Sequence, residues 1–203
     1  MKPSGGDTRH FSYEAALQLA FYALLAMGTA ALSYVAYVAI EARAYQAAET
    51  RKIELKMAQP AESQSTPVLS QGSAIGRIEI PRLGLAAIVV QGDSAAILRH
   101  AVGHIPGTPL PGQPGNVALA GHRDTFFRPL RDIQIGDTIM LQTPGGDYRY
   151  LVESTTVVPP AETEVLQSSS VRELTLVTCY PFHYIGEAPN RFIVRARELQ
   201  PAP

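Results

Sequence analysis

One thiol and one imidazole stand at the ends of two predicted strands. The chain of 203 residues has a single cysteine, Cys179, which ends the apolar run ELTLVTC, and His122 ends the run NVALAGH. A cysteine that attacks a carbonyl group needs an accessible thiolate, a proton carrier and a group that stabilises the oxyanion. The two strand ends predict that Cys179 and His122 face each other across a groove, as nucleophile and proton carrier.

The last predicted strand supplies a cationic group. Arg191, Arg195 and Arg197 alternate along RFIVRAR, so all three point to one face of that strand. A guanidinium near the thiol favours the thiolate and donates hydrogen bonds to an oxyanion. The alternative for Cys179 is a small, inert core residue, because free cysteine is readily buried. One cysteine cannot form an intramolecular disulfide or a cysteine-rich zinc site.

Three further histidines compete for a chemical role. His183 lies four residues after Cys179 and is a rival base on the rim of the same cleft. His100 and His104 have the spacing of helical metal ligands, but Gly103 breaks a helix there and no third ligand is near. We therefore predict no metal site, and a structural or surface role for both of these histidines.

Composition narrows the class of protein. The formal net charge is −1, and there is neither a basic block nor a basic stripe with interleaved aromatic residues, which argues against a nucleic-acid partner. No pattern indicates a cofactor. A strand-rich domain of this size buries about two thirds of its extended-chain surface, so it needs no disulfide to fold.

The N-terminal region predicts a membrane helix. Residues 15–40 contain no charged side chain and lie between Glu14 and Glu41. About 20 apolar residues span a bilayer as a helix. The alternative is a cleaved signal peptide with ARA at 42–44, but the apolar run is longer than a signal peptide requires. We predict an N-terminal flank at 1–14 and an uncleaved signal anchor at 15–40.

The next region is predicted to connect this anchor to a folded domain. Residues 41–58 are rich in alanine, glutamate and lysine and predict a solvated helix. Residues 59–73 are polar, contain two prolines and predict a flexible linker. The domains are therefore a linker at 41–73, helical and then flexible, and a folded domain at 74–199.

Short strands and turns dominate the chain from Ala74 onward. One short helix is predicted at 93–103, with Asp93 or Ser94 as its cap and Gly103 at its end. Seven or eight strands with little helix predict a small antiparallel or mixed β-barrel. The predicted strands cover residues 75–81, 85–92, 116–122, 138–143, 148–158, 173–179 and 191–199.

Three segments resemble the motifs of the sortase family: NVALAGHRDTFF at 116–127, ELTLVTCYPF at 173–182 and APNRFIVRAR at 188–197. The segment GHIPGTPLPGQPGN resembles the class D branch most closely, and the similarity covers residues 75–198. The resemblance implies a mainly β fold, a sortase-like eight-stranded β-barrel with short helices, preceded by an N-terminal transmembrane helix.

The resemblance also implies a reaction and the residues that carry it. Sortases are cysteine transpeptidases that cut a secreted protein at a C-terminal LPXTG-like sorting signal and pass the acyl group to an amine. By position in the motifs, Cys179 is the nucleophile that forms a thioacyl enzyme, His122 the general acid and base, and Arg191 the group that stabilises the oxyanion. Thr178 and Ala120 would line the substrate pocket.

Partners and location follow from the same resemblance. The implied partners are secreted proteins with a sorting signal and an amine acceptor, such as a cell-wall precursor or a pilin lysine. The implied location is the bacterial cytoplasmic membrane, which the chain crosses once with the barrel outside the cytoplasm. The flanking charges disagree slightly. Lys2 and Arg9 precede the apolar run, whereas Arg43, Arg51 and Lys52 follow it, which favours a cytoplasmic barrel by one charge. The three motifs outweigh that margin.

Two other functions stay open. A cysteine protease or hydrolase would use the same residues with water in place of the amine, and product analysis would distinguish it. A membrane-tethered binding domain without catalytic activity is the second alternative. The presence of all three residue types, Cys179, His122 and Arg191, argues against an inactive site.

Overall fold

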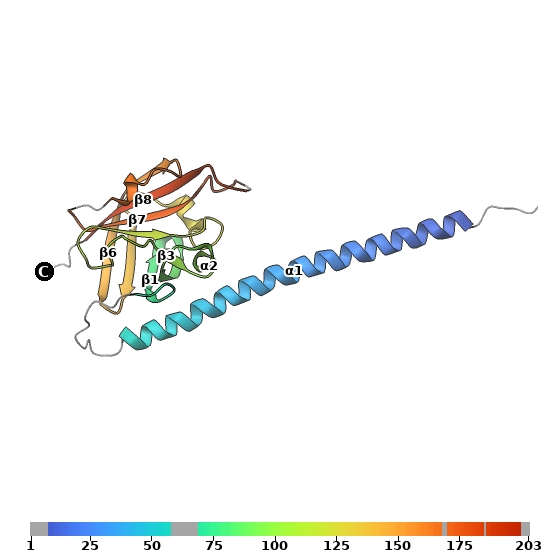
Figure 1. The fold of residues 1–203 in the computed structure, drawn as a ribbon, viewed down its shortest axis with the longest axis horizontal. Helices are drawn as coiled ribbons and strands as arrows, with labels where there is room; N and C mark the ends of the chain where they lie inside the picture. The colour runs from blue at the N-terminus through green and yellow to red at the C-terminus, as the bar shows by residue number, and fades with distance from the viewer. Residues whose placement is uncertain (1–7, 58–68, 168–169, 185, 200–203) are drawn as a thin grey trace, which may run out of the picture. The chain divides into compact units, whose positions relative to one another are not determined.

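The computed structural model consists of two compact units, Met1–Arg43 and Ala44–Pro203. The helix α1, Thr8–Met57, begins in the first unit and ends in the second, and all the strands belong to the second (Figure 1). Most of the predicted linker at 59–73 lies outside the described residues. The structure describes residues 8–57, 69–167, 170–184 and 186–199.

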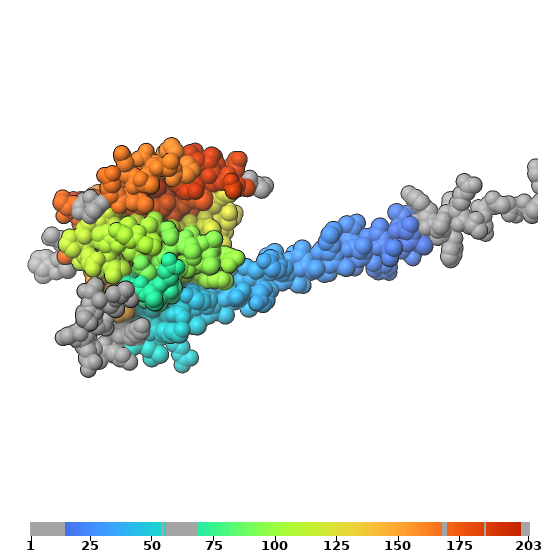
Figure 2. Space-filling view, in the orientation of Figure 1, coloured from blue at the N-terminus to red at the C-terminus, as the bar shows by residue number. Residues whose placement is uncertain are grey.

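The N-terminal part of α1 is apolar on all sides. Large side chains such as Leu19 and Leu32 are each 73% exposed, and Figure 2 shows this part of the helix as a single rod of side chains. Residues 15–53 are long and apolar enough to cross a membrane, by length and composition. A helix that is apolar all round suits a lipid environment. It is therefore a candidate membrane span, as the sequence predicts for residues 15–40.

Eight strands close into a barrel in the order β1-β2-β3-β4-β7-β8-β6-β5. The pairs β2–β3 and β4–β7 are parallel and the others are antiparallel, which confirms the predicted mixed barrel. The strands are β1 Ala74–Ile80, β2 Leu85–Gln91, β3 Val102–His104, β4 Asn116–Ala120, β5 Thr138–Thr143, β6 Gly146–Val158, β7 Glu173–Tyr180 and β8 Asn190–Glu198. The short helices are η1 Pro81–Leu83, α2 Ala95–Leu98, η2 Arg128–Asp132 and η3 Glu164–Leu166.

One predicted element is wrong in part. The sequence predicts a helix at 93–103, but only α2 is helical there, and β3 follows it as a strand between β2 and β4. Gly103 makes this pairing possible, because a Cβ atom at that position would lie 2.3 Å from the Gly92 carbonyl oxygen. A glycine required for close approach of two backbones looks in the sequence like the end of a helix.

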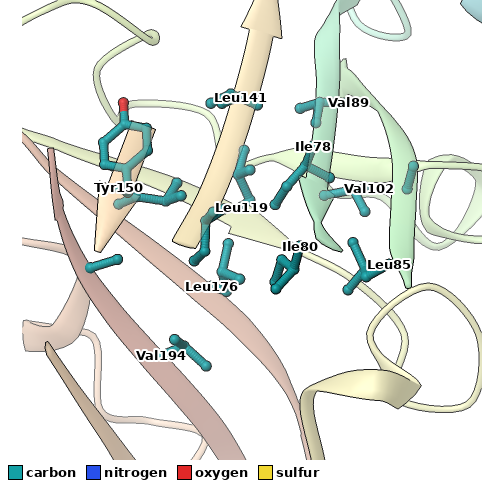
Figure 3. Close-up of a cluster of buried hydrophobic side chains, with 14 of the residues drawn as sticks. Ile78, Ile80, Leu85, Val89, Val102, Leu119, Leu141, Tyr150, Leu176 and Val194 are labelled. Carbon is teal, nitrogen blue, oxygen red and sulfur yellow. The ribbon is translucent and has the colours of Figure 1, made fainter. Parts of the chain in front are cut away.

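Apolar side chains fill the barrel. Leu119 of β4, Leu176 of β7 and Val194 of β8 point inward to meet Ile78 and Tyr150, and all five are fully buried (Figure 3). Full burial of one such aliphatic side chain contributes about 1.5–3 kcal/mol. Because successive residues of a strand alternate between faces, the residues between these on β4, β7 and β8 face the outside of the barrel.

The last turns of α1 pack on the barrel within the unit Ala44–Pro203. The Gln46 side chain accepts a hydrogen bond from the Ile88 backbone N–H at 2.7 Å and donates one to the His100 carbonyl at 2.6 Å. Ile53, 5% exposed, joins a small apolar cluster with Ile88. The sequence predicts a solvated helix for 41–58, which is wrong for this face of the helix, since Gln46 and Ile53 are two turns apart on one side.

Candidate active site

Cys179 and Arg191 are direct partners across the antiparallel pair β7–β8. Residues that lie opposite each other in such a pair have Cα atoms about 4.5–5.5 Å apart and side chains on the same face. Each is three residues from an inward-pointing side chain, Leu176 on β7 and Val194 on β8. Alternation therefore places both side chains on the outer face of the barrel, where Cys179 is a half-buried free thiol.

His122 comes two residues after the end of β4, the neighbouring strand on the other side of β7. β4 runs parallel to β7, with Ala120 opposite Val177, and the Gly121 N–H continues the pairing by donating to the Val177 carbonyl at 3.1 Å. His122 follows Ala120 by two residues and Cys179 follows Val177 by two, so the register of the pair leads both residues to the same end of the two strands. The predicted arrangement of Cys179 and His122 across a groove stays a prediction.

The strand order β4-β7-β8 thus sets Cys179 between His122 on one side and Arg191 on the other. An acid–base group and a cationic hydrogen-bond donor on either side of a thiol meet the requirements of nucleophilic catalysis. Ala120 is half-buried and lies on the same outer face, two residues before His122. Its predicted contact with substrate stays a prediction.

Thr178 connects the two reactive strands from the inside. Its side chain is 2% exposed and points away from the face that carries Cys179. The Thr178 hydroxyl donates to the Gly121 carbonyl at 2.7 Å. This bond ties β7 to the residue before His122, which is a positioning role. The substrate contact predicted for Thr178 stays a prediction.

The turn after His122 holds the backbone of the histidine. The N–H groups of Thr125 and Phe127 donate to the His122 carbonyl at 3.3 and 3.1 Å. Phe127 is fully buried, and a Cβ atom on Gly121 would lie 2.7 Å from its ring. Glycine is needed before His122 because the aromatic ring packs directly against its backbone.

Arg123 is a site residue that the sequence does not reveal. It follows His122 directly, its side chain is only 6% exposed, and its guanidinium donates to the carbonyls of Pro181, Tyr184 and Gly186 in the loop after Cys179. Backbone carbonyl acceptors leave no trace in the side-chain pattern. The position of a charged residue next to His122 is the only signal that the sequence offers.

The arginines of β8 have different partners. Arg191 donates to two backbone carbonyls, at 3.1 and 3.3 Å, and it has no carboxylate within ion-pair distance among the residues that the structure describes. Arg197 forms an ion pair with Glu153 at 2.8 Å. Arg195 donates to a backbone carbonyl of η3 at 3.3 Å. Only Arg191 combines a place beside Cys179 with a guanidinium free of acidic partners in the described part of the chain.

Two of the remaining histidines, His183 and His104, differ in exposure. His183 is exposed on the loop after β7. His104 is 1% exposed, with Nδ1 2.9 Å from the Gln91 side chain and Nε2 2.9 Å from the Pro109 carbonyl. Burial lowers the pKa of His104 from 6.5. The structural role predicted for His104 is confirmed.

A closed mixed barrel with cysteine and arginine on two paired strands, and histidine directly after the third neighbouring strand, defines a thiol-dependent acyl-transfer class of fold and site. The Sortase domain family matches residues 78–199, more than half of the chain. The chain therefore belongs to the sortase family, whose members are cysteine transpeptidases.

Individual relatives agree with this assignment, and two of them, named Sortase D, are consistent with the class D resemblance. Sortase D of Bacillus subtilis (strain 168) is 35% identical over 129 residues, which are 63% of this chain and 65% of that protein's length. The solved structure of a Clostridium perfringens Sortase D5 transpeptidase superposes with a TM-score of 0.66 at 26% identity, covering 73% of this chain and 94% of that one. Sortase A from Corynebacterium diphtheriae gives 0.61 at 25% identity, covering 80% and 86%.

Proposed function

We propose that this chain is a membrane-anchored transpeptidase that cleaves a C-terminal LPXTG-like sorting signal and transfers the acyl group to an amine. The observation that carries the proposal is the place of Cys179 between His122 and Arg191 on the outer face of the barrel. A similar fold supports the substrate class: sortase C of Clostridium perfringens was solved with the C-terminal cell wall sorting motif, and it superposes with a TM-score of 0.61 at 27% identity, covering 74% of this chain and 85% of that one.

The first half of the reaction forms a thioester. The Cys179 thiolate attacks the carbonyl carbon of the scissile peptide bond, and the oxyanion accepts hydrogen bonds from the Arg191 guanidinium and from backbone N–H groups. The imidazolium of His122 gives its proton to the leaving nitrogen as the C–N bond breaks. The acyl group stays on the sulfur, and the C-terminal fragment leaves as an amine.

The second half transfers the acyl group. An incoming amine loses a proton to His122 and attacks the thioester carbon, and the Cys179 thiolate leaves as the new amide bond forms. Two steps through a covalent intermediate predict ping-pong kinetics. The hydrogen bonds from the Thr178 hydroxyl to the Gly121 carbonyl and from the Gly121 N–H to the Val177 carbonyl support a fixed separation of the two strands in both steps. In this proposal the small Ala120 side chain lines the substrate pocket.

The membrane part of the proposal is an uncleaved anchor with the barrel outside the cytoplasm. The apolar stretch in residues 15–53 supports the anchor. The test is a membrane-impermeant maleimide applied to intact bacteria that produce the chain, since Cys179 is the only thiol. Labelling of intact cells is expected. Labelling that needs permeabilised cells would contradict the orientation.

The reaction itself is tested with the full chain in detergent micelles and its Cys179→Ala variant. Each protein is mixed with a pooled library of LPXTG-like peptides and a small primary amine, and products are identified by mass spectrometry. Amine-ligated product that requires Cys179 is the expected result. Cleavage without ligation would show a thiol hydrolase instead, and no product together with an unreactive thiol would contradict the catalytic role of Cys179.

A further inference from the structure

Arg123 connects the segment that carries His122 to the loop that follows Cys179. Its Nη1 donates to the Pro181 carbonyl at 2.9 Å, and its Nη2 donates to the Tyr184 and Gly186 carbonyls at 2.6 and 3.2 Å. These acceptors lie in the segment between β7 and β8, which leads from Cys179 to Arg191.

The surroundings of the Arg123 guanidinium are those of a fixed structural contact. The side chain is 6% exposed and lies 6.0 Å from the centre of the Tyr184 ring. Among the described residues its acidic partner is Asp124, which is 63% exposed and 3.4 Å away. The planar guanidinium donates in fixed directions, and hydrogen bonds from a charged donor are stronger than neutral ones. The hydrogen bonds from Arg123 to these three carbonyls therefore hold the loop at a defined place relative to residue 123.

His122 and Cys179 lie between two sets of hydrogen bonds, both of which join the segment that contains β4 to the segment that contains β7. On one side of the pair, the Gly121 N–H bonds to β7 and the Thr178 hydroxyl bonds to the Gly121 carbonyl. β4 ends at Ala120, so its pairing with β7 stops before the level of Cys179. The next link is Arg123, directly after His122, bonded to Pro181, two residues after Cys179.

We propose that Arg123 is a positioning residue that fixes the separation of His122 from Cys179 by holding the loop after β7. This rests on the proposed function, in which one imidazole serves both proton transfers at one thiol. A displacement of about 1 Å in such a pair lowers the rate about 100-fold. Arg123 touches neither reacting group and acts through the backbone on both sides of the pair.

The test compares Arg123→Ala, Arg123→Lys, His122→Ala and Arg82→Ala in the full chain in detergent. Arg82 is the matched control, because its guanidinium also donates to several acceptors, the Asp137 carboxylate and the Asp132 carbonyl, none of which belongs to the site. Two quantities are measured: kcat and KM of peptide ligation, and the rate of Cys179 alkylation by iodoacetamide as a function of pH. Alkylation needs no peptide, so this test works even if the proposed substrate class is wrong.

The expected result for Arg123→Ala is a fall in kcat of about 100-fold with little change in KM, and an alkylation profile that moves to that of His122→Ala. Lysine should restore part of kcat, since it keeps the charge but not the planar array of donors. Arg82→Ala should lower the melting temperature and keep the wild-type alkylation profile.

Three results would overturn the proposal. One is a folded Arg123→Ala variant with wild-type kcat and a wild-type alkylation profile. Another is a His122→Ala profile equal to that of the wild type, since there would then be no pair to position. If Arg123→Ala does not fold, the Arg123→Lys variant is the test. A wild-type kcat and a wild-type alkylation profile in Arg123→Lys would then overturn the role of the guanidinium. If no peptide is ligated but the alkylation profile of Cys179 still changes in His122→Ala and Arg123→Ala, the result counts against the proposed function and not against the positioning role of Arg123.

Discussion

The two ends of β8 present the same residue type on the same face of the barrel in different surroundings. At one end Arg191 lies opposite Cys179 and bonds only to backbone carbonyls in the described part of the chain. At the other end Arg197 forms an ion pair with Glu153, with the two side chains 60% and 44% exposed. A guanidinium with a carboxylate beside it already has a charged partner, whereas one without such a partner can donate to an anion that forms during a reaction.

This difference shows why spacing alone does not identify a functional arginine. Arg191, Arg195 and Arg197 are equivalent in the alternating pattern, and the fold distinguishes them by what lies across from each one. The neighbouring strands supply a thiol at one end and a carboxylate at the other. Substitutions at the two ends should therefore change different properties of the protein.

The largest expected effect is at the end of β8 beside the thiol. Arg191→Ala should lower kcat of peptide ligation about 100-fold or more, as removal of one oxyanion donor does in other enzymes. The change in melting temperature should be small, because the Arg191 side chain makes only two hydrogen bonds to carbonyls in the described residues. Steady-state kinetics and thermal unfolding of the purified chain measure both.

Arg197→Ala is the matched control on the same strand. An exposed ion pair contributes about 0–1 kcal/mol, so this variant should keep wild-type kcat and nearly wild-type stability. Equal losses of activity at both positions would mean that the overall charge of β8 matters and that the place of Arg191 beside Cys179 does not.

The next effect concerns the glycine before His122. Gly121→Ala should lower stability by about 1–3 kcal/mol, because the new methyl group overlaps the Phe127 ring and something must shift. The shift moves the turn that holds His122, so kcat should fall at least tenfold, about 1.4 kcal/mol in the barrier. Urea unfolding and ligation kinetics give the two values.

Gly145→Ala controls for the loss of a glycine elsewhere, since the nearest atom to its added Cβ is 3.6 Å away. That variant should keep wild-type activity and stability. A Gly121→Ala variant as active as Gly145→Ala would show that the packing of Phe127 does not position the histidine.

A smaller effect separates two buried hydroxyls of β7. The Thr178 hydroxyl donates to the Gly121 carbonyl, and the Thr175 hydroxyl donates to Asn116 at 2.8 Å. Valine at either position removes one buried hydrogen bond and should cost about 1–3 kcal/mol of stability. Only Thr178→Val should also lower kcat, by about fivefold, because only that bond ends beside His122. Equal kcat in the two variants would remove Thr178 from the positioning of the pair.

The smallest effect appears only in acid and concerns another paired arginine. Hydrogen bonding from the Arg82 guanidinium lowers the pKa of Asp137 below its ordinary 3.8, and Asp137 is 7% exposed. A carboxyl whose folded-state pKa is lowered stabilises the fold above pH 3.8 and loses that contribution as the pH falls through the folded-state pKa. The stability difference between wild type and Arg82→Ala should therefore shrink below pH 3.8. A difference that stays constant from pH 7 to pH 2 in urea titrations would contradict the pair.

Much of the barrel is predictable from local pattern. Runs such as RIEI at 77–80 in β1 alternate between polar and apolar residues, and turns of glycine and proline separate the strands. The sequence does not predict β3, because three residues carry no periodicity, or the packed face of α1, because Gln46 bonds to backbone groups far away in the chain. Contacts made by the backbone of another segment leave no mark in the sequence that they stabilise.

The candidate site, like the fold, is predictable from the sequence only in part. Cys179, His122 and Arg191 stand out by residue type at strand ends, and the structure places them on or directly after three neighbouring strands. Their side-by-side arrangement depends on β4 and β7 being parallel neighbours, although 52 residues separate the two strands. Arg123, like Gln46, is not predictable from the sequence, because its side chain bonds to backbone carbonyls of another segment.

The most direct test of a covalent role for Cys179 is the mass of the intact protein during the reaction. The full chain in detergent is mixed, without amine, with a peptide that the library experiment identifies as a ligation substrate. The reaction is quenched in acid within seconds. A mass increase equal to the acyl fragment, lost on addition of amine and absent from Cys179→Ala, is the predicted result. Ligated product without any such increase at short times, or an increase that persists in Cys179→Ala, would contradict the thioacyl mechanism.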